Sequence, residues 1–256
     1  MVEEAGATQG NSVVKIDNQQ IAVVFDNPHL LKNAKNMLMK HNVVFNGKIA
    51  SFNHIRNLYH VDCVSTPRLV PKLKEKFVNP TPFLAMNVCQ ATRTLSNSVA
   101  KGLEYYVQTH ELQDSALDTA AFVEFHDMLF DVFNSRSSSS SKKPYRGPIT
   151  AESCHWSFLE VAEGILKSMY YTSNTCFDTR KAKKESKTLT TKQRKPNYLR
   201  GFIDNINSIR WLWKTLCEEF GSTELCTNYL CQDCVENLFG EIRSCFQVCG
   251  NISLRK

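Results

Sequence analysis

The feature that most constrains the fold is a short apolar run, Ile21–Phe25, which ends directly in Asp26-Asn27-Pro28. A continuous run of apolar, largely β-branched residues is typical of a strand buried on both faces. Asn27 is a favourable N-cap and Pro28 suits the first helical position, so a helix is predicted to begin there and to end near His41. Its apolar residues recur at helical spacing: Leu30, Ala34, Met37 and Leu38. A strand, an acidic residue at its end and a helix together indicate an α/β unit.

The middle of the chain has a different pattern, with poor strand signals between residues 80 and 220. Apolar spacing there predicts one long helix and three further helices. They are marked by Met86, Leu95, Val99 and Leu103; by Phe122, Phe125, Leu129 and Val132; by Phe158, Ala162, Ile165, Leu166 and Met169; and by Ile206, Ile209, Trp213 and Leu216. Polar loops are expected near 135–147, which contains a serine run, and near 178–198. The predicted fold class is therefore mainly α with a small α/β part.

The last stretch predicts a helix with Val235, Phe239, Ile242 and Phe246 on its apolar face. Glu236 lies about 100° around the helix from Val235, at the border of that face, where a carboxylate can reach a cleft beside a packed core. Asp233 and Glu236 share the first turn. Acids in a first turn are also favoured by the helix dipole alone, which is the competing explanation for both.

Composition narrows the class of protein. No run of about 18 apolar residues is present, so a membrane span is not expected. The acidic start MVEEAGATQG resembles neither a secretory signal nor a transit peptide, which favours the cytosol or nucleus. The ten cysteines are scattered, as expected for buried thiols in a reducing compartment. A zinc site around Cys231-x-x-Cys234 is the alternative, but Cys234 and Cys245 would lie about 16 Å apart on one helix.

Basic charge is concentrated in one segment, Arg180–Arg200, which holds nine Lys/Arg and one Glu, a local charge of +8. The segment has almost no apolar content and is predicted to be a solvated loop. It is either a charged linker or a contact for DNA phosphates, since lysine and arginine clusters bind them with release of counterions.

Two segments together identify a family. FDNPHLLKN at 25–33 and QDCVENLFGEIR at 232–243 resemble motifs of the P-element and THAP-type transposases, and LRGFIDNINSIRWLW at 199–213 resembles the segment between them. The resemblance covers roughly residues 12–256. It implies an RNase H-like fold interrupted by a large α-helical, GTP-binding insertion. It also implies that Asp26 and Glu236 are the second and third catalytic acids and ligands of Mg²⁺. The implied DNA partner is the transposon ends, the implied location is the nucleus, and self-association into a homo-oligomer is consistent with the family.

The resemblance implies a nucleotide site as well. Phe130, Asp131 and Asn134 in FDVFN are similar to the family's guanine-contacting segment, and Asp233 is expected to approach the same nucleotide. A carboxylate that accepts two N–H bonds from guanine is a sensible reader of that base. The alternative is that Phe130 is a core residue and that Asp131 and Asn134 close a helix. No GxxxxGK[ST] motif is present, so GTP would be bound without a Walker-type loop.

The predicted organisation is a tail (1–11), a partial RNase H-like segment (12–55), a helical GTP-binding insertion (56–222) and an RNase H-like C-terminal helix segment (223–256). The family's first catalytic acid lies on an earlier strand that the residues before Asp26 do not match. Asp17 falls in an expected turn with Asn18 and is not a good substitute. The family's zinc-bearing THAP module has no match either.

Two functional classes follow from this pattern. The first is a fragment, or a decayed or domesticated copy, of a P-element-type transposase that would not cleave DNA as it stands, because two carboxylates hold a metal pair poorly. The second is a non-catalytic protein derived from the insertion, which binds nucleotide or DNA or associates with itself.

Overall fold

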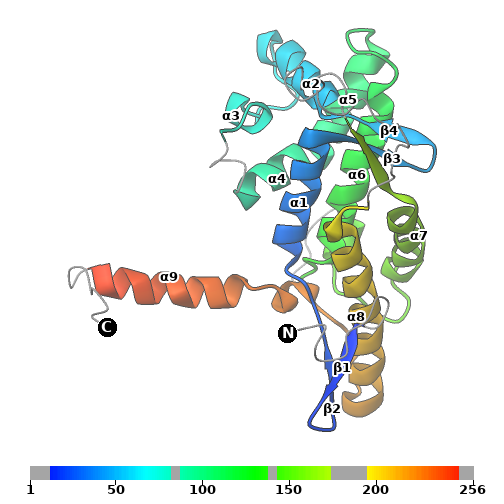
Figure 1. Cartoon of the computed structure of the whole chain (residues 1–256), viewed down its shortest axis with the longest axis vertical. Coiled ribbons are helices and arrows are strands. Elements are labelled where there is room, and N and C mark those ends of the chain that lie inside the picture. The colour runs from blue at the N-terminus through cyan, green and yellow to red at the C-terminus, as the bar shows by residue number, and fades with distance from the viewer. Residues whose placement is uncertain (1–11, 82–86, 138–142, 174–194, 248–256) are drawn as a thin grey trace, which may run out of the picture.

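The computed structural model describes residues 12–81, 87–137, 143–173 and 195–247, without the side chains of 233, 234 and 245–247. Over these residues the chain is mainly helical with two small sheets, as expected (Figure 1). The elements are β1 (Val13–Ile16), β2 (Gln19–Ala22), α1 (Asn27–Lys40), β3 (His41–Phe45), β4 (Lys48–Ala50), α2 (Phe52–Val64), α3 (Glu75–Val78), α4 (Val88–Thr94), α5 (Asn97–Gln108), α6 (Ala116–Val132), η2 (Pro144–Arg146), α7 (His155–Ser168), β5 (Tyr170–Ser173), α8 (Asn197–Phe220), η3 (Thr227–Leu230) and α9 (Asp233–Gln247).

The hydrophobic core lies between the helices that apolar spacing predicts. α1 packs against α6 and α8, and α5 packs along α6. The side chains that fill this space include Leu38 from α1, Phe122 from α6 and Phe202 from α8, each with no exposed surface. Burial of apolar area at such positions is the main stabilising contribution to the fold.

The single long helix predicted through Leu95, Val99 and Leu103 is wrong. α4 ends at Thr94 and α5 begins at Asn97, and Ser96 between them has extended backbone angles (φ −124°, ψ 152°). Apolar spacing continues across the break because Leu95 and Val99 both face the same core, so periodicity alone does not reveal it. The predicted marker Met86 lies outside the described residues.

The run Ile21–Phe25 is not the buried strand that its composition predicts. β2 stops at Ala22 and pairs only with β1 among the described residues, in a two-stranded hairpin with Val14 opposite Ile21. The expected turn at Asp17-Asn18 is confirmed: both residues have positive φ (49° and 65°), as a two-residue hairpin turn requires. A two-stranded ribbon leaves one face uncovered, and Ile21 is therefore exposed.

The backbone of Val23 and Phe25 is hydrogen-bonded to side chains of α8 and not to a neighbouring strand. The Asn205 side chain of α8 accepts a hydrogen bond from Phe25 N (2.7 Å) and donates one to Phe25 O (2.8 Å). Ser208 donates to Val23 O (2.5 Å). These side chains satisfy backbone groups that would otherwise need a neighbouring strand.

The second sheet joins distant parts of the chain in the antiparallel order β4-β3-β5. Val43 of β3 is opposite Ala50 of β4 on one side and Tyr171 of β5 on the other. The poor strand signals between 80 and 220 did not predict β5. This strand has only four residues, and its hydrogen-bonding partner is more than 120 positions earlier in the chain.

α9 is a helix, as predicted, and it extends away from the remaining elements (Figure 1). Four of its apolar side chains are 39–56% exposed: Val235, Leu238, Phe239 and Ile242. The expectation about membranes agrees with the structure, since no helix among the described residues is long and apolar enough to cross one.

Candidate functional site

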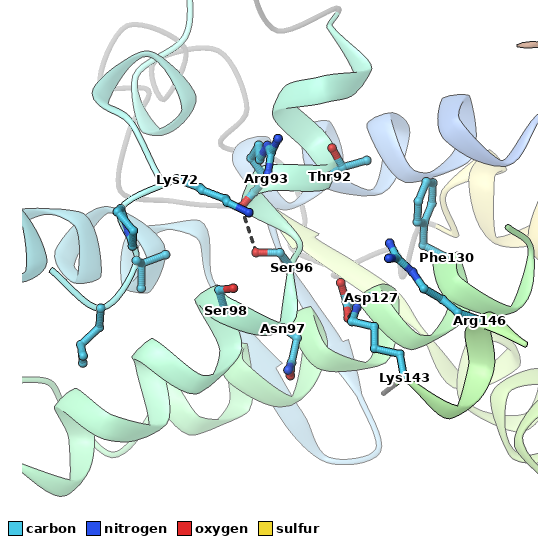
Figure 2. Close-up of a pocket in the computed structure, with 13 residues that line it drawn as sticks. Lys72, Thr92, Arg93, Ser96, Asn97, Ser98, Asp127, Phe130, Lys143 and Arg146 are labelled. Carbon is cyan, nitrogen blue, oxygen red and sulfur yellow. Dashed lines mark hydrogen bonds and ion pairs between the residues drawn. The ribbon is translucent and has the colours of Figure 1, made fainter. Parts of the chain in front are cut away.

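A pocket of about 620 Å³ opens where the break between α4 and α5 faces α6 and η2 (Figure 2). Its lining is rich in cations and hydroxyl groups. The residues are Leu69, Val70, Pro71, Lys72, Thr92, Arg93, Ser96, Asn97, Ser98, Asp127, Phe130, Lys143 and Arg146. Its volume is in the range that encloses a small organic ligand.

One wall is built around the start of α5. The backbone carbonyl of Ser96 accepts from Val99 N (2.9 Å) and Ala100 N (3.1 Å), which fixes the first turn of the helix. The N-terminus of a helix carries a partial positive charge and favours anions. Lys72 and Arg93 line the same side of the pocket, and both are exposed. This wall is therefore electropositive.

The segment that carries Lys72 is fixed by Asp62, a carboxylate on α2 with no exposed surface. Asp62 accepts from Leu69 N (2.7 Å) and Val70 N (3.1 Å). It also pairs with Arg68 Nε (2.9 Å). A buried charge with this many donors is stable only as a complete set, so the loop has one well-defined conformation.

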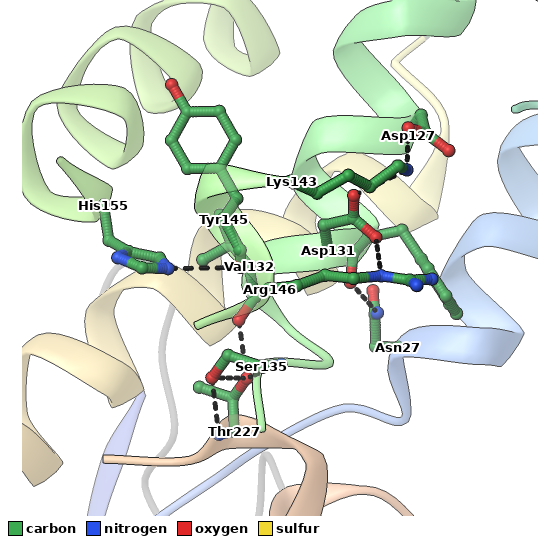
Figure 3. A network of polar contacts seen from close by, with 11 residues as sticks. Asn27, Asp127, Asp131, Val132, Ser135, Lys143, Tyr145, Arg146, His155 and Thr227 are labelled. Atoms are coloured by element: carbon green, nitrogen blue, oxygen red, sulfur yellow. Dashed lines mark hydrogen bonds and ion pairs between the residues drawn. The ribbon is translucent and has the colours of Figure 1, made fainter. Parts of the chain in front are cut away.

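The opposite wall is a chain of alternating charges (Figure 3). Lys143 Nζ lies 2.6 Å from Asp127 Oδ2 and 2.7 Å from Asp131 Oδ2. Arg146 Nε lies 2.9 Å from Asp131 Oδ1. Phe130 follows the same face of α6 and lines the pocket beside them. Partial burial lowers the pKa of Lys143, but the hydrogen bonds to Asp127 and Asp131 outweigh this effect, and the net shift of that pKa is upward.

Of the three predicted nucleotide residues whose side chains are described, Phe130 lines this pocket, and Asp131 and Asn134 do not. The Asp131 side chain is 5% exposed and lies behind the lining residues in its two ion pairs. Asn134 follows the end of α6, where its N–H donates to Asp131 O (3.2 Å). The side chain of Asp233 lies outside the described residues.

Sequence reasoning missed the cations of the pocket. Lys72, Arg93, Lys143 and Arg146 come from four separate segments with no shared motif. A signal was present at Ser96-Asn97, since serine there is a typical N-cap and marks a helix start that could face an anion. The continuous apolar periodicity concealed it.

The predicted catalytic acid Asp26 caps α1, a position that the sequence reading assigned wrongly to Asn27. Its Oδ2 accepts from His29 N (3.2 Å) and contacts the His29 ring, and its Oδ1 accepts from Gln232 N (3.0 Å). Asp26 has the extended backbone that capping requires. Asn27 is buried and donates to Phe130 O (3.4 Å), which joins the start of α1 to the wall of the pocket.

The predicted acid Glu236 lies one helical turn after Gln232, whose carbonyl accepts from Glu236 N (2.9 Å). The contact between Asp26 and Gln232 therefore brings Asp26 to the base of α9, the helix that carries Glu236. The side chain of Glu236 is exposed.

The described residues do not fit a two-metal centre. Both oxygens of Asp26 already accept hydrogen bonds from the protein. Among the described side chains, no group of three or more His, Cys, Asp or Glu residues could hold a metal ion, zinc included. The side chains of Cys234 and Cys245, which the zinc alternative needs, are not among the described ones. Residues 180–194 of the basic segment also lie outside the described residues.

Comparisons with known proteins confirm the resemblance seen in the sequence. Residues 28–147 match the family described as TNP-like, GTP-binding insertion domain. The chain is 27% identical over 228 residues to the transposable element P transposase of Drosophila melanogaster, covering 89% of this chain and 28% of that protein. It is 27% identical over 201 residues to DNA transposase THAP9 of Homo sapiens, covering 77% of this chain and 20% of that protein.

A solved structure is similar as well. The Drosophila P element transposase strand transfer complex matches with a TM-score of 0.76 and 25% identity, over 95% of this chain and 52% of that chain. The chain is thus a distant relative of the P-element and THAP9-type transposases over most of its length. It spans between 20% and 28% of the length of the two curated relatives.

Proposed function

We propose that this chain binds a guanine nucleotide in the pocket between α5 and α6, as the GTP-binding part of a P-element-type transposase. The observation that carries the proposal is the position of the pocket's lining residues in the sequence. Every lining residue of the pocket lies between Leu69 and Arg146, inside the region that matches a GTP-binding insertion domain.

The two walls suit the two ends of a nucleotide. Lys72, Arg93 and the N-terminus of α5 present positive charge and backbone donors for phosphates. Phe130 on the other wall offers an aromatic ring against which a purine can stack. No Walker-type loop is needed in this arrangement, because a helix start and two cations take its place.

Isothermal titration calorimetry with GTP and ATP tests the proposal. We expect wild-type protein to bind GTP more tightly than ATP, and Lys72→Ala/Arg93→Ala to weaken GTP binding at least about 10-fold, since hydrogen bonds to charged groups contribute about 1.5–3 kcal/mol. The matched control is Lys48→Ala/Arg136→Ala, which removes two exposed cations outside the pocket. Absence of GTP binding, or equal affinity for GTP and ATP, would refute the proposal.

Asp26 and Glu236 are proposed to correspond to the second and third acids of a transposase active site. Support comes from their two motifs and from the distant homology over most of the chain. Because the described residues do not form a two-metal centre, the activity proposed for this chain by itself is nucleotide binding and not Mg²⁺-dependent DNA cleavage. We also propose a nuclear location for the protein, on the same family resemblance.

DNA binding is a second candidate function, favoured by the +8 charge of Arg180–Arg200 and by the strand transfer complex of the solved relative. We expect weak binding to double-stranded DNA that falls steeply with salt, because phosphate contacts release counterions. Fluorescence anisotropy between 50 and 200 mM salt measures it. Replacement of the lysines at 181, 183, 184 and 187 by Gln should make the affinity for DNA less dependent on salt concentration. An affinity that does not change with salt in the wild type would contradict binding through phosphate contacts.

A further inference from the structure

The helix α4 is docked on the rest of the fold through a small apolar face. Its buried residues are Gln90, Ala91 and Thr94, so two of the three have polar side chains. α4 packs mainly against α1, and Figure 1 shows it beside α1 at the edge of the molecule. Elements that bury little apolar surface open at the lowest free energy cost. α4 is therefore expected to open more readily than α1, α5 or α6.

The face of α1 that meets α4 contains a buried cation. Lys35 has no exposed surface, and its one hydrogen bond among the described residues is a long contact from Nζ to Gln90 Oε1 (3.5 Å). Thr94 lies one helical turn after Gln90, is equally buried, and has a hydroxyl without a hydrogen-bond partner among the described residues. Lysine is almost never fully buried without a charged partner. The contact between α1 and α4 is thus costly as well as small.

The protonation state of Lys35 affects how firmly α4 is docked. Burial lowers the pKa of Lys35 from 10.5 to about 8, because a charged amine is disfavoured away from water. Titratable groups on the other elements that pack against α1 do not contribute to this shift: Arg93 of α4, His126 and Asp131 of α6, His41 of β3, and Tyr198 and Asp204 of α8.

Docking of α4 is expected to become more favourable as pH rises. Below about pH 8, Lys35 is protonated whether α4 is docked or open, so pH has no effect on docking. Above that pH the docked form loses the proton, whereas Lys35 in the open form keeps it up to about pH 10.5. Docking should therefore strengthen about 10-fold between pH 7 and pH 9. Near neutral pH the contact is at its weakest.

α4 also carries part of the wall of the pocket. Thr92 and Arg93 line the cavity, and they lie between Ala91 and Thr94, which are buried against the fold. Movement of α4 away from α1 would take Thr92 and Arg93 out of the wall. The pocket is therefore complete only while α4 is docked.

We propose that α4 is a lid on the pocket, which opens and closes at its contact with α1, and that Lys35 is the group that keeps the lid weakly docked. The inference rests on the proposed function for the identity of the ligand, and it adds a means of regulating the site. A nucleotide that contacts Thr92 or Arg93 binds the closed form and shifts α4 towards it.

Hydrogen exchange measured by mass spectrometry tests the proposal. At pH 7, amides of α4 in the wild type should exchange faster than those of α5 and α6, and GTP should slow them. Lys35→Met replaces the cation with an apolar side chain of similar length, and should raise the protection of α4 at least about 10-fold. The wild type should gain about 10-fold protection in α4 between pH 7 and pH 9, and Lys35→Met should gain none. The matched control is Lys40→Met, at the exposed end of the same helix, which should behave like the wild type.

A second variant tests the same contact without changing its charge. Thr94→Val removes the buried hydroxyl that has no partner, so it should also raise the protection of α4 at pH 7 while it keeps the pH dependence. Circular dichroism checks that each variant is folded. Because Thr94→Val and the pH series in the wild type do not depend on Lys35→Met, the proposal can be tested even if that variant does not fold.

The outcomes separate the lid from the nucleotide site. Unchanged protection of α4 in Lys35→Met, or protection in the wild type that does not rise between pH 7 and pH 9, overturns the role of Lys35. If calorimetry detects GTP binding but GTP leaves the exchange of α4 unchanged, α4 is not a lid, and the proposed function stands. If the wild type binds no nucleotide, the proposed function fails, and the exchange of α4 alone decides whether Lys35 controls its docking.

Discussion

At the scale of single residues, His126 shows how the core sets a pH limit on stability. It lies on α6 with no exposed surface, and its ring is within 4.1–6.3 Å of the rings of Phe122, Phe125, Tyr198 and Phe202. Burial lowers the pKa of His126 to about 4, although its hydrogen bond to Phe122 O acts in the opposite direction. The folded protein therefore holds this imidazole neutral where the unfolded chain would protonate it.

The expected result is an acid-dependent loss of stability. Between about pH 6.5 and pH 4 the unfolded state binds more protons at His126 than the folded state, so the free energy of unfolding falls as pH falls, by up to about 3 kcal/mol. Urea denaturation at pH 7 and pH 4.5 measures it. His126→Phe should reduce the fall, and the exposed His60→Gln should leave it unchanged. An equal fall in the free energy of unfolding in the wild type and in His126→Phe would show that His126 does not cause the acid-dependent loss of stability.

At the scale of elements, two glycines on helices predict opposite effects of the same substitution. A Cβ on Gly102 of α5 would lie 2.6 Å from Val70 Cγ2 and 3.4 Å from Leu58 Cδ1, both on fully packed side chains. Overpacking costs about 1–3 kcal/mol of stability. The higher helix propensity of alanine compared with glycine offsets about 1 kcal/mol of this cost. Gly102→Ala should therefore lower stability by up to about 2 kcal/mol, and should weaken nucleotide binding because Val70 lines the pocket.

Gly164 of α7 is the matched control, since a Cβ there would meet nothing within 4 Å. Gly164→Ala should raise stability by about 0.5–1 kcal/mol without effect on nucleotide binding. Thermal unfolding and calorimetry of both variants give the comparison. A Gly102→Ala protein as stable as the wild type would show that α5 can move away from Val70.

The elements that the sequence predicts are those that depend on local patterns, and the elements it does not predict depend on long-range contacts. The helices α1, α6, α7, α8 and α9 follow from apolar spacing, which is local. β5 and the partner of Val23–Phe25 depend on contacts more than 120 positions apart, which no local pattern contains. The pocket was missed for the same reason, because its cations come together only after α5, α6 and η2 pack.

At the scale of the whole molecule, the acidic pair and the pocket are linked through the start of α1. Asp26 contacts Gln232 before α9, and the next residue, Asn27, contacts Phe130 of the pocket. A second link joins the end of α6 to η3, where Ser135 N and Thr227 N each donate to the other residue's hydroxyl (3.0 Å). Segments about 100 and 200 positions apart thus meet at one end of α6.

This arrangement predicts no DNA cleavage by the chain alone. Mg²⁺ pairs that cleave phosphodiesters need several carboxylates at a site with free coordination positions. Here Asp26 accepts hydrogen bonds through both oxygens, and the described residues include no group of three possible ligands. With Mg²⁺ and GTP, the wild type should convert supercoiled plasmid to nicked circles no faster than Glu236→Ala and Asp26→Asn, which control for contaminating nuclease. Nicking by the wild type that Glu236→Ala abolishes would show that α9 can bring its carboxylate to Asp26 and complete a metal site.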